Sequence, residues 1–424
     1  MSLMPKPHAI FGAGLSAQAA RRLALAKGLE AVLIDEAGEG DQSTFVAADV
    51  ARFEAFVFSP GFAEAHPWRV LAEDSGRPCF SEIAFAAQYW EGAIIGITGT
   101  NGKTTLTALI HKALSLCGHV SVAAGNIGYP LSDAVLSEAN QPSAYAVVEI
   151  SSFQAELADG LRLDVLLWTN LAEDHLDRYG SMSRYYEAKA RLFSCLKSDG
   201  VCVIGGQLED WMADHQKQFD ACIVAHEDAA RAFPLSANSV FNRFPNSENF
   251  LIAAELWWLL EKPPAALIGA ADGFSLAPHR LAVVAERAGV RFWNDSKATN
   301  FHATLAALES VSCPIIWIGG GRAKGGDVEA FAHAVAGQVE AAILYGEVGD
   351  RLATALDGIL ERVQVHARFE DAVLAAAELA ASIPMANVLL SPGFASFDQF
   401  DSYAHRGKSF IDTVLSLKST QELS

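Results

Sequence analysis

A glycine-rich stretch with one lysine constrains this chain more than any other feature. The apolar run Ala93–Ile97 has the composition of a buried strand, and apolar residues recur at helical spacing from Leu106 to Leu114. A glycine-rich turn between a strand and a helix points backbone N–H groups at a phosphate chain. Its lysine neutralises the outer phosphates, and a threonine hydroxyl can ligate Mg²⁺. The sequence therefore predicts ATP or GTP binding by Gly99, Thr100, Asn101, Gly102, Lys103, Thr104 and Thr105.

The strict form of this phosphate-binding motif has glycine where Ile97 stands, so a plain strand–turn–helix is the alternative. The two glycines that bracket Thr-Asn, placed between a strand and a helix, favour the phosphate site.

Composition limits the classes of partner. The formal net charge of −19 argues against a nucleic-acid partner, which needs a basic footprint. The 424 residues suffice for two to three domains, and a hydrophobic content of 51% fits well-buried α/β domains. No apolar stretch reaches the roughly 18 residues of a membrane span, and the N-terminus lacks a signal-peptide pattern. We expect a cytoplasmic enzyme that is a monomer.

The first segment has the pattern of a Rossmann-like domain. Residues 8–11 form an expected strand, Gly12-Ala-Gly-Leu-Ser-Ala an expected turn, and a helix runs to about Lys27. The next strand ends at Asp35, where a ribose-binding acid would sit. A dinucleotide-dependent oxidoreductase is therefore a rival interpretation at this point. A strand over 55–58 then enters the turn Ser59-Pro-Gly61.

A second α/β unit begins near residue 91. Its strand 144–149 ends in Glu149, where a Mg²⁺-linked carboxylate belongs beside a phosphate loop. Another strand, over 164–170, leads to His175, which is flanked by acids and is a metal-ligand candidate. Lys189 lies on an expected helix over 181–192, and the residues alone favour a surface lysine.

A third unit starts around Pro278 and alternates strands with alanine-rich helices, as a second Rossmann-like domain does. Lys324 lies in the glycine-rich stretch 319–326 after a strand, which favours an anionic ligand over a loop without a role. The predicted fold class is α/β with three domains: Rossmann-like (1–90), central P-loop ATPase-type (91–277) and Rossmann-like (278–424).

Eight motifs occur in one order, and together they resemble the Mur ligases, ATP-dependent amide-bond-forming enzymes of bacterial peptidoglycan synthesis. These motifs are Thr98-Gly-Thr-Asn-Gly-Lys-Thr-Thr, Glu149-Ile-Ser-Ser-Phe-Gln, Asn170-Leu-Ala-Glu-Asp-His-Leu-Asp-Arg-Tyr, Lys189, Asn246-Ser-Glu-Asn, Pro278-His-Arg, Asn294-Asp-Ser-Lys-Ala-Thr-Asn and Leu390-Ser-Pro-Gly-Phe-Ala-Ser-Phe-Asp-Gln-Phe. The resemblance implies a UDP-sugar domain, a central ATPase and an amino-acid-binding domain.

The resemblance also implies the reaction. ATP would activate a carboxylate as an acyl-phosphate, and an amine would attack the acyl carbon to give a tetrahedral intermediate. Within the family, the stretches Ser-Ser-Phe-Gln, Asp-Ser-Lys-Ala-Thr-Asn and Ala-Ser-Phe-Asp-Gln-Phe imply UDP-N-acetylmuramoyl-L-alanine and D-glutamate as substrates.

Residue roles carry over by position in the matching motifs. Lys103 would hold the β- and γ-phosphates. Two Mg²⁺ ions would be held by Thr104, Glu149, His175 and Lys189, the last as a carbamylated lysine. The C-terminal residues that close on ATP and the acyl-phosphate would be Arg280, Asp295 and Lys297. The adenine contacts would be Asn246 and Asn249.

Two further groups would bind substrates. The glutamate carboxylates would be held by Thr299, Lys324, Ser396 and Tyr403. The UDP-sugar site would be lined by Leu15, Ser16, Asp35, Gly61, Asn126, Ser151 and Gln154.

The chain departs from the family pattern at a few of these positions. Pro245 stands where histidine is usual in the adenine motif. Glu36 and Ala37 replace polar and basic residues, and Tyr403 replaces phenylalanine.

Three alternatives to this assignment remain open. The chain could be a related amide ligase, such as a folylpolyglutamate-type or L-glutamate-adding enzyme. An oxidoreductase would leave the phosphate loop unexplained. A non-catalytic nucleotide-binding module would leave four residues without a joint purpose: Glu149, His175, Lys189 and Lys297.

Overall fold

A computed structural model describes residues 6–217, 222–287 and 289–417 of the chain. The chain divides into two compact units. The first spans Met1–Leu171, Ser183–Asn242 and Asn246–Phe274; the second spans Ala172–Met182, Arg243–Pro245 and Ser275–Ser424. The segment 172–182 therefore groups with the C-terminal part of the chain although it comes from the middle of the sequence.

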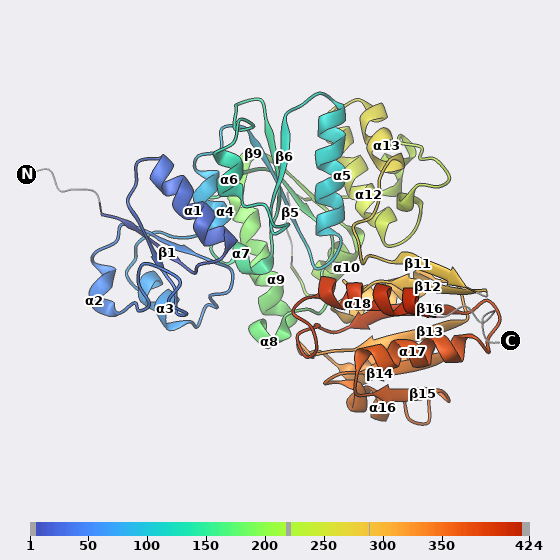
Figure 1. Cartoon of the computed structure of the whole chain (residues 1–424). Coiled ribbons are helices and arrows are strands. Elements are labelled where there is room, and N and C mark those ends of the chain that lie inside the picture. Colours follow the sequence, from blue (N-terminus) through green and yellow to red (C-terminus); the bar gives the residue numbers. More distant parts are fainter. Residues whose placement is uncertain (1–5, 218–221, 288, 418–424) are drawn as a thin grey trace, which may run out of the picture. The chain divides into compact units, whose positions relative to one another are not determined.

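The first unit begins with a parallel sheet of four described strands in the order β2-β1-β3-β4. Figure 1 shows β1 of this sheet with the helices α1–α4 around it. The strands are β1 (His8–Phe11), β2 (Ala31–Ile34), β3 (Phe56–Phe58) and β4 (Cys79–Ser81). The helices are α1 (Leu15–Ala26), α2 (Ala47–Val50), α3 (Pro67–Glu73) and α4 (Glu82–Ala87). Aromatic side chains fill this core, and the rings of Phe11 and Phe58 stack with centroids 4.2 Å apart.

The same unit holds a second parallel sheet, whose six described strands have the order β10-β9-β8-β5-β7-β6. They are β5 (Ala93–Thr98), β6 (Ser121–Gly125), β7 (Tyr145–Glu149), β8 (Leu163–Trp168), β9 (Leu196–Ile204) and β10 (Cys222–Val224). Because β7, β5 and β8 are parallel neighbours, their carboxyl ends lie together at one edge. That edge carries the glycine-rich loop, Glu149 and the segment after Trp168.

Helices α5, α12 and α13 pack beside one another on this sheet (Figure 1) and bury one apolar cluster around Trp257 and Leu109. The helices and 3₁₀ segments of this part are α5 (Lys103–Leu116), α6 (Leu131–Val135), α7 (Ser152–Ala155), α9 (Met182–Ala190), η1 (Arg191–Cys195), α10 (Gly206–Asp214), α11 (Glu227–Arg231), η2 (Val240–Asn242), α12 (Asn246–Leu259) and α13 (Pro264–Asp272).

Two buried carboxylates, those of Glu82 and Glu156, connect the helices around the first sheet to segments around the second sheet of this unit. Glu82 of α4 is 2% exposed and accepts the backbone N–H of Ser132, in α6, at 2.6 Å. Arg69 of α3 is 1% exposed and donates to Glu156 at 2.5 Å. A buried charged pair is costly unless both groups are satisfied, so these contacts fix where the first sheet docks.

The second unit contains a sheet in the order β11-β12-β16-β13-β14-β15, parallel except for the edge strand β11. Its strands are β11 (Ala282–Arg287), β12 (Val290–Asn294), β13 (Ile315–Gly320), β14 (Ala341–Tyr345), β15 (Val363–His366) and β16 (Asn387–Gly393). Its helices are α8 (Leu176–Tyr179), α14 (Phe301–Ser310), α15 (Val328–Ala336), α16 (Gly349–Leu356), α17 (Phe369–Ala380) and α18 (Tyr403–Ser416). Two apolar clusters cover the sheet, one under α17 and α18 and one under α14–α16.

The α/β fold class expected from the sequence is confirmed by these sheets. The patterned strands at residues 8–11, 93–97 and 144–149 occur within a residue of their expected bounds. The short strands β4, β6, β10 and β15 and the antiparallel β11 were not expected. The domain boundaries near residues 90 and 277 stay predictions. None of the helices in the described ranges combines the length and the apolar composition needed to cross a bilayer.

Burial raises the pKa of Glu82 to about 7, although hydrogen bonds from Ser132 work in the opposite direction. An unfolded glutamate ionises from its ordinary pKa of 4.5, whereas the folded side chain stays protonated up to about pH 7. Stability should therefore fall as pH rises between these values. The variant Glu82→Gln should not show this fall. Its unfolding free energy, measured by urea denaturation relative to that of the unchanged chain, should therefore rise by about 1–3 kcal/mol between pH 4.5 and pH 8. A stability difference independent of pH would contradict this.

Candidate active site

The glycine-rich loop between β5 and α5 has backbone torsions that L-residues rarely adopt. Gly99 has φ +139° and Gly102 has φ +85°. A Cβ atom at Gly99 would lie 1.9 Å from the Thr169 hydroxyl oxygen. Gly102 is the N-cap of α5, with no side-chain capping hydrogen bond. The first-turn N–H groups of such a helix lack intrahelical acceptors and form an anion site.

Lys103 folds back over this loop. Its Nζ donates to the carbonyl oxygens of Gly99 and Thr100, each at 2.8 Å. Thr104 and Thr105 follow in the first turn of α5. The loop residues expected to bind phosphate are therefore gathered at the helix N-terminus.

Glu149 lies beside the loop because β7 pairs with β5, which places Glu149 opposite Ile97. It is 3% exposed, and its Oε1 accepts a hydrogen bond from Asn126 at 2.9 Å. Its Oε2 is buried and meets no hydrogen-bond donor among the described residues. A buried carboxylate oxygen without a donor is costly in itself and fits a bound cation.

Lys189, on α9, is 1% exposed, so the surface lysine favoured by the residue pattern is wrong. Its Nζ donates to the Gly99 carbonyl at 2.9 Å and lies 3.5 Å from the Thr98 hydroxyl oxygen. It also sits 4.7 Å from the ring centroid of Tyr185, whose hydroxyl is 3.3 Å from that of Thr100. The structure thus brings Lys189 to the phosphate loop.

His175, the fourth metal-ligand candidate, belongs to the second unit. It has φ +55° and its Nε2 lies 3.7 Å from a carboxylate oxygen of Asp174. Among the described residues, no group of three or more His, Cys, Asp and Glu side chains gathers as a metal site. A cation at the loop edge would therefore draw first on the Glu149 carboxylate and the Thr104 hydroxyl.

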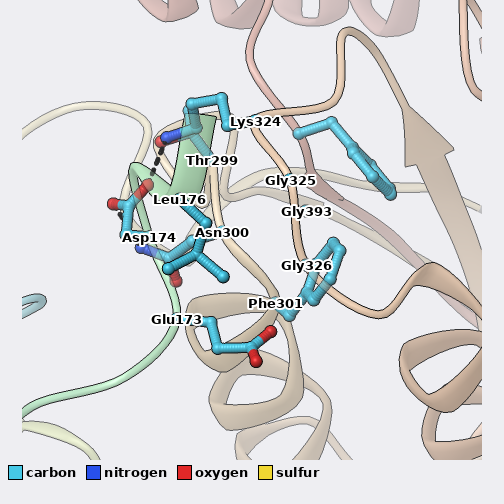
Figure 2. Close-up of a pocket in the computed structure, with 11 residues that line it drawn as sticks. Glu173, Asp174, Leu176, Thr299, Asn300, Phe301, Lys324, Gly325, Gly326 and Gly393 are labelled. Atoms are coloured by element: carbon cyan, nitrogen blue, oxygen red, sulfur yellow. Dashed lines mark hydrogen bonds and ion pairs between the residues drawn. The ribbon is translucent and has the colours of Figure 1, made fainter. Parts of the chain in front are cut away.

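A pocket lies wholly within the second unit (Figure 2). Figure 2 shows the Lys324 and Asn300 side chains directed at Asp174. Lys324 Nζ is 2.7 Å from Asp174 Oδ1, and Asn300 donates to Oδ2 at 3.2 Å. The pocket is lined by Glu173, Asp174, Leu176, Thr299, Asn300, Phe301, Lys324, Gly325, Gly326, Gly393 and Phe394.

The electrostatics of the pocket centre on Asp174. Burial acts to raise its pKa, but Lys324, His175 and the Asn300 hydrogen bond outweigh it and lower that pKa. Asp174 is therefore an anion paired with Lys324, the lysine expected to hold an anionic ligand. Thr299 lines the same pocket, which brings two of the four expected glutamate-binding residues together.

A second group in this unit surrounds Lys297. Its Nζ donates to the Tyr403 hydroxyl at 3.1 Å and lies 4.6 Å from that ring's centroid. Asp295 accepts from the Leu281 N–H at 3.0 Å and from the Ser391 hydroxyl at 2.8 Å. Burial raises the pKa of Asp295 to about 7, against these hydrogen bonds.

Arg406 donates hydrogen bonds to the backbone beside this group. It is fully buried and donates to the Ser296 carbonyl at 2.8 Å and to the Phe394 carbonyl at 3.1 Å. These hydrogen bonds hold in place the two loops that carry Lys297 and Ser396.

The residues expected to bind the UDP-sugar are spread over the first unit. Leu15 opens α1 and is 72% exposed, and Ser16 follows it. Asp35 accepts the N–H of Ala37 at 3.0 Å, so one of its oxygens closes its own turn. Ser151 and Gln154 form a capping box at the start of α7. Asn126 donates to Glu149 beside the glycine-rich loop, whereas Gly61 lies in an exposed turn.

The expected adenine contacts lie at the start of α12. Asn249 is 5% exposed and approaches the phosphate loop so closely that a Cβ at Gly102 would be 2.3 Å from its Oδ1. Asn246 is the first residue of the helix. Arg280 lies in the turn before β11, in the second unit.

Sequence reasoning did not single out several residues at these sites. Asp174 and Asn300 flank predicted residues, so their place in a motif was a usable signal. Tyr185 could have been found from its spacing of four residues before Lys189 on one helix. Arg406 gave no signal, because a buried arginine cannot be told from a surface one by pattern.

Comparison with known proteins identifies the family of the chain. Residues 97–251 match the model of the Mur ligase middle domain, and residues 279–394 match that of the Mur ligase glutamate ligase domain. Among solved structures, MurF ligase from Thermotoga maritima in complex with ADP shares the fold, with TM-score 0.59, 15% identity and coverage of 97% of this chain and 95% of that one. MurC (UDP-N-acetylmuramate-alanine ligase) from T. maritima aligns with TM-score 0.58 at 15% identity, over 97% of this chain and 100% of that one.

The chain belongs to the Mur ligase family. Within the family, it is 35% identical over 408 residues to the UDP-N-acetylmuramoylalanine–D-glutamate ligase of Geobacter metallireducens, covering 89% of this chain and 85% of that protein. It is 33% identical over 448 residues to the enzyme of the same name from Syntrophus aciditrophicus, covering 96% of each.

Gly99→Ala tests the geometry of the phosphate loop. The alanine would need an unfavourable φ and would clash with Thr169, so unfolding free energy should drop by about 3 kcal/mol or more, with loss of ATP binding. Gly118→Ala is the matched control, because Gly118 also has positive φ but a Cβ there meets nothing within 4 Å. That control should cost only about 1 kcal/mol in urea denaturation and leave ATP binding intact. Equal losses in both variants would contradict the close approach.

Proposed function

We propose that this chain is an ATP-dependent ligase that joins D-glutamate to UDP-N-acetylmuramoyl-L-alanine through an amide bond. The observation that carries the proposal is the buried Glu149 oxygen, which lacks a donor in the described structure and lies at the edge of the phosphate loop. A phosphate loop beside a cation-binding carboxylate supports phosphoryl transfer. The similarity to D-glutamate ligases over most of the chain selects the substrates.

On the nucleotide side, the first turn of α5 and Lys103 would bind the phosphates of ATP, and Asn246 and Asn249 the adenine. Mg²⁺ would be held by Thr104, Glu149, His175 and Lys189, with Lys189 carbamylated and two ions in the site. The cations would offset the repulsion between a carboxylate and the γ-phosphate.

On the amino-acid side, Lys324 and Thr299 would receive carboxylates of D-glutamate, together with Ser396 and Tyr403. Lys324 forms an ion pair with Asp174 in the described structure, so a bound carboxylate would compete with Asp174 for that lysine. The UDP-sugar would bind against Leu15, Ser16, Asp35, Gly61, Asn126, Ser151 and Gln154.

The reaction follows from these placements. An oxygen of the L-alanine carboxylate would attack the γ-phosphorus of ATP, releasing ADP and forming an acyl-phosphate. The neutral amine of D-glutamate would attack the acyl carbon, and the tetrahedral intermediate would lose a proton and expel phosphate. Lys297 and Arg280 would stabilise the charge on the transferred phosphoryl group.

Phosphate release tests the substrates directly. With ATP, Mg²⁺ and UDP-N-acetylmuramoyl-L-alanine, D-glutamate should stimulate release strongly, whereas L-glutamate, other amino acids and dihydropteroate should not. The measurement is inorganic phosphate by a coupled assay, with the amide product confirmed by mass spectrometry. Stimulation by L-glutamate or by a folate substrate would favour the related amide ligases, and absence of stimulation by D-glutamate would sink this assignment.

Lys189→Ala tests the carbamate. Turnover should fall by about 100-fold or more, because the variant lacks an anionic ligand for Mg²⁺. Added bicarbonate or acetate should restore part of it, since a small anion can fill the space of the carbamate. Lys217→Ala, which replaces a partly exposed lysine of the same unit, is the control. Unchanged turnover in Lys189→Ala would remove this lysine from the site.

The proposal includes a monomeric enzyme that acts in the cytoplasm. Sedimentation at several concentrations measures the oligomeric state, and a single species near 45.2 kDa is expected.

A further inference from the structure

We propose that Asn170 is a positioning residue for ATP, because its amide clamps the backbone of the phosphate loop at Asn101. This inference rests on the proposed ATP-dependent function and names a residue outside the predicted site. Asn170 lies just after the end of β8, and β8 pairs with β5, the strand that enters the loop. It is 9% exposed, so its polar atoms must find partners within the protein.

The clamp consists of hydrogen bonds on both sides of one loop residue. Asn170 Oδ1 accepts the backbone N–H of Asn101 at 2.9 Å. Asn170 Nδ2 donates to the backbone carbonyl of Asn101 at 3.3 Å. The backbone carbonyl of Asn170 accepts the N–H of Thr100 at 3.0 Å. The side-chain amide thus pairs with the loop as a neighbouring strand would.

Adjacent residues hold the clamp itself. The Thr169 hydroxyl donates to the Asn101 carbonyl at 2.6 Å. Gln207 makes a reciprocal pair with the backbone of Leu171, at 2.9 Å and 2.7 Å. The Asn170 carbonyl also accepts the Trp168 indole N–H at 3.2 Å. These hydrogen bonds hold the segment after β8 in place, and the phosphate loop is positioned by its hydrogen bonds to that segment.

The consequence for phosphate binding concerns which N–H groups are available. The clamp directs the N–H groups of Thr100 and Asn101 to residue 170 and away from a phosphate. Phosphate recognition then falls to the N-terminus of α5, beyond Gly102, which has no side-chain cap. A loop already held in this shape binds ATP without the cost of ordering it.

The experiment compares Asn170 with Asn140, which makes the same kind of backbone clamp in the same unit. Asn140 Oδ1 accepts the Glu91 N–H at 2.8 Å, and Asn140 Nδ2 donates to the carbonyls of Tyr89 and Val135. Asn140 belongs to none of the proposed sites. Both residues are changed to Ala, which removes the amide, and to Leu, which keeps its approximate volume.

The dissociation constant for Mg²⁺-ATP is measured by calorimetry, and the KM values for ATP and D-glutamate by phosphate release. Asn170→Ala and Asn170→Leu should weaken ATP binding and raise the KM for ATP by about 10- to 100-fold, as expected for two lost hydrogen bonds. The KM for D-glutamate should stay within about threefold, because the clamp supports only the phosphate loop. The Asn140 variants should lower the unfolding temperature but leave ATP affinity within about twofold.

Unchanged ATP affinity in a folded Asn170 variant would overturn the inference, as would equal losses of ATP affinity in the Asn140 variants. If neither Asn170 variant folds, Thr169→Val removes the Thr169–Asn101 hydrogen bond at nearly constant shape. It should weaken ATP binding by about threefold or more, and unchanged affinity would again overturn the inference. Unmodified protein that binds ATP but ligates no D-glutamate would refute the proposed reaction and leave the positioning role standing.

Discussion

The parallel pairing of β7, β5 and β8 is the constraint on which the rest of the first unit depends. Three neighbouring strands that run the same way deliver their carboxyl ends to one edge. The glycine loop, Glu149 and Asn170 share this edge because each lies at or just after the carboxyl end of one of these strands. The helix α9 then needs only to approach the same edge for Lys189 to reach the Gly99 carbonyl.

Buried polar groups specify the loops around this framework. In the second unit, Asp174 binds Lys324 and Asn300, and Arg406 binds two loop carbonyls. Each of these groups would be costly without its partners, so the loops have few alternative arrangements. The same logic joins the first sheet to the central one through Arg69 and Glu156. Apolar clusters stabilise the sheets, whereas these polar contacts position the side chains of the candidate site.

The sequence predicted the features that local pattern controls. The phosphate loop, the acid that ends β7 and the alternation of strands with helices all leave periodic or spacing signals. The burial of Lys189 left none, because α9 has a polar composition and its lysine is hidden by tertiary packing. The pair Lys324–Asp174 joins residues 150 positions apart, and the clamp on Asn101 joins residues 69 apart. Contacts of this kind depend on how elements pack, which neither propensity nor spacing encodes.

The membership of residues 172–182 in the C-terminal unit limits how this protein can be taken apart. A fragment that began at residue 275 would contain all the described strands of this sheet, β11 to β16. It would lack Glu173, Asp174 and Leu176, which line the pocket. Its Lys324 would keep its place in the loop after β13 and lose the carboxylate that holds it. This pocket is therefore formed by two separated stretches of one chain, and such a fragment would not reproduce it.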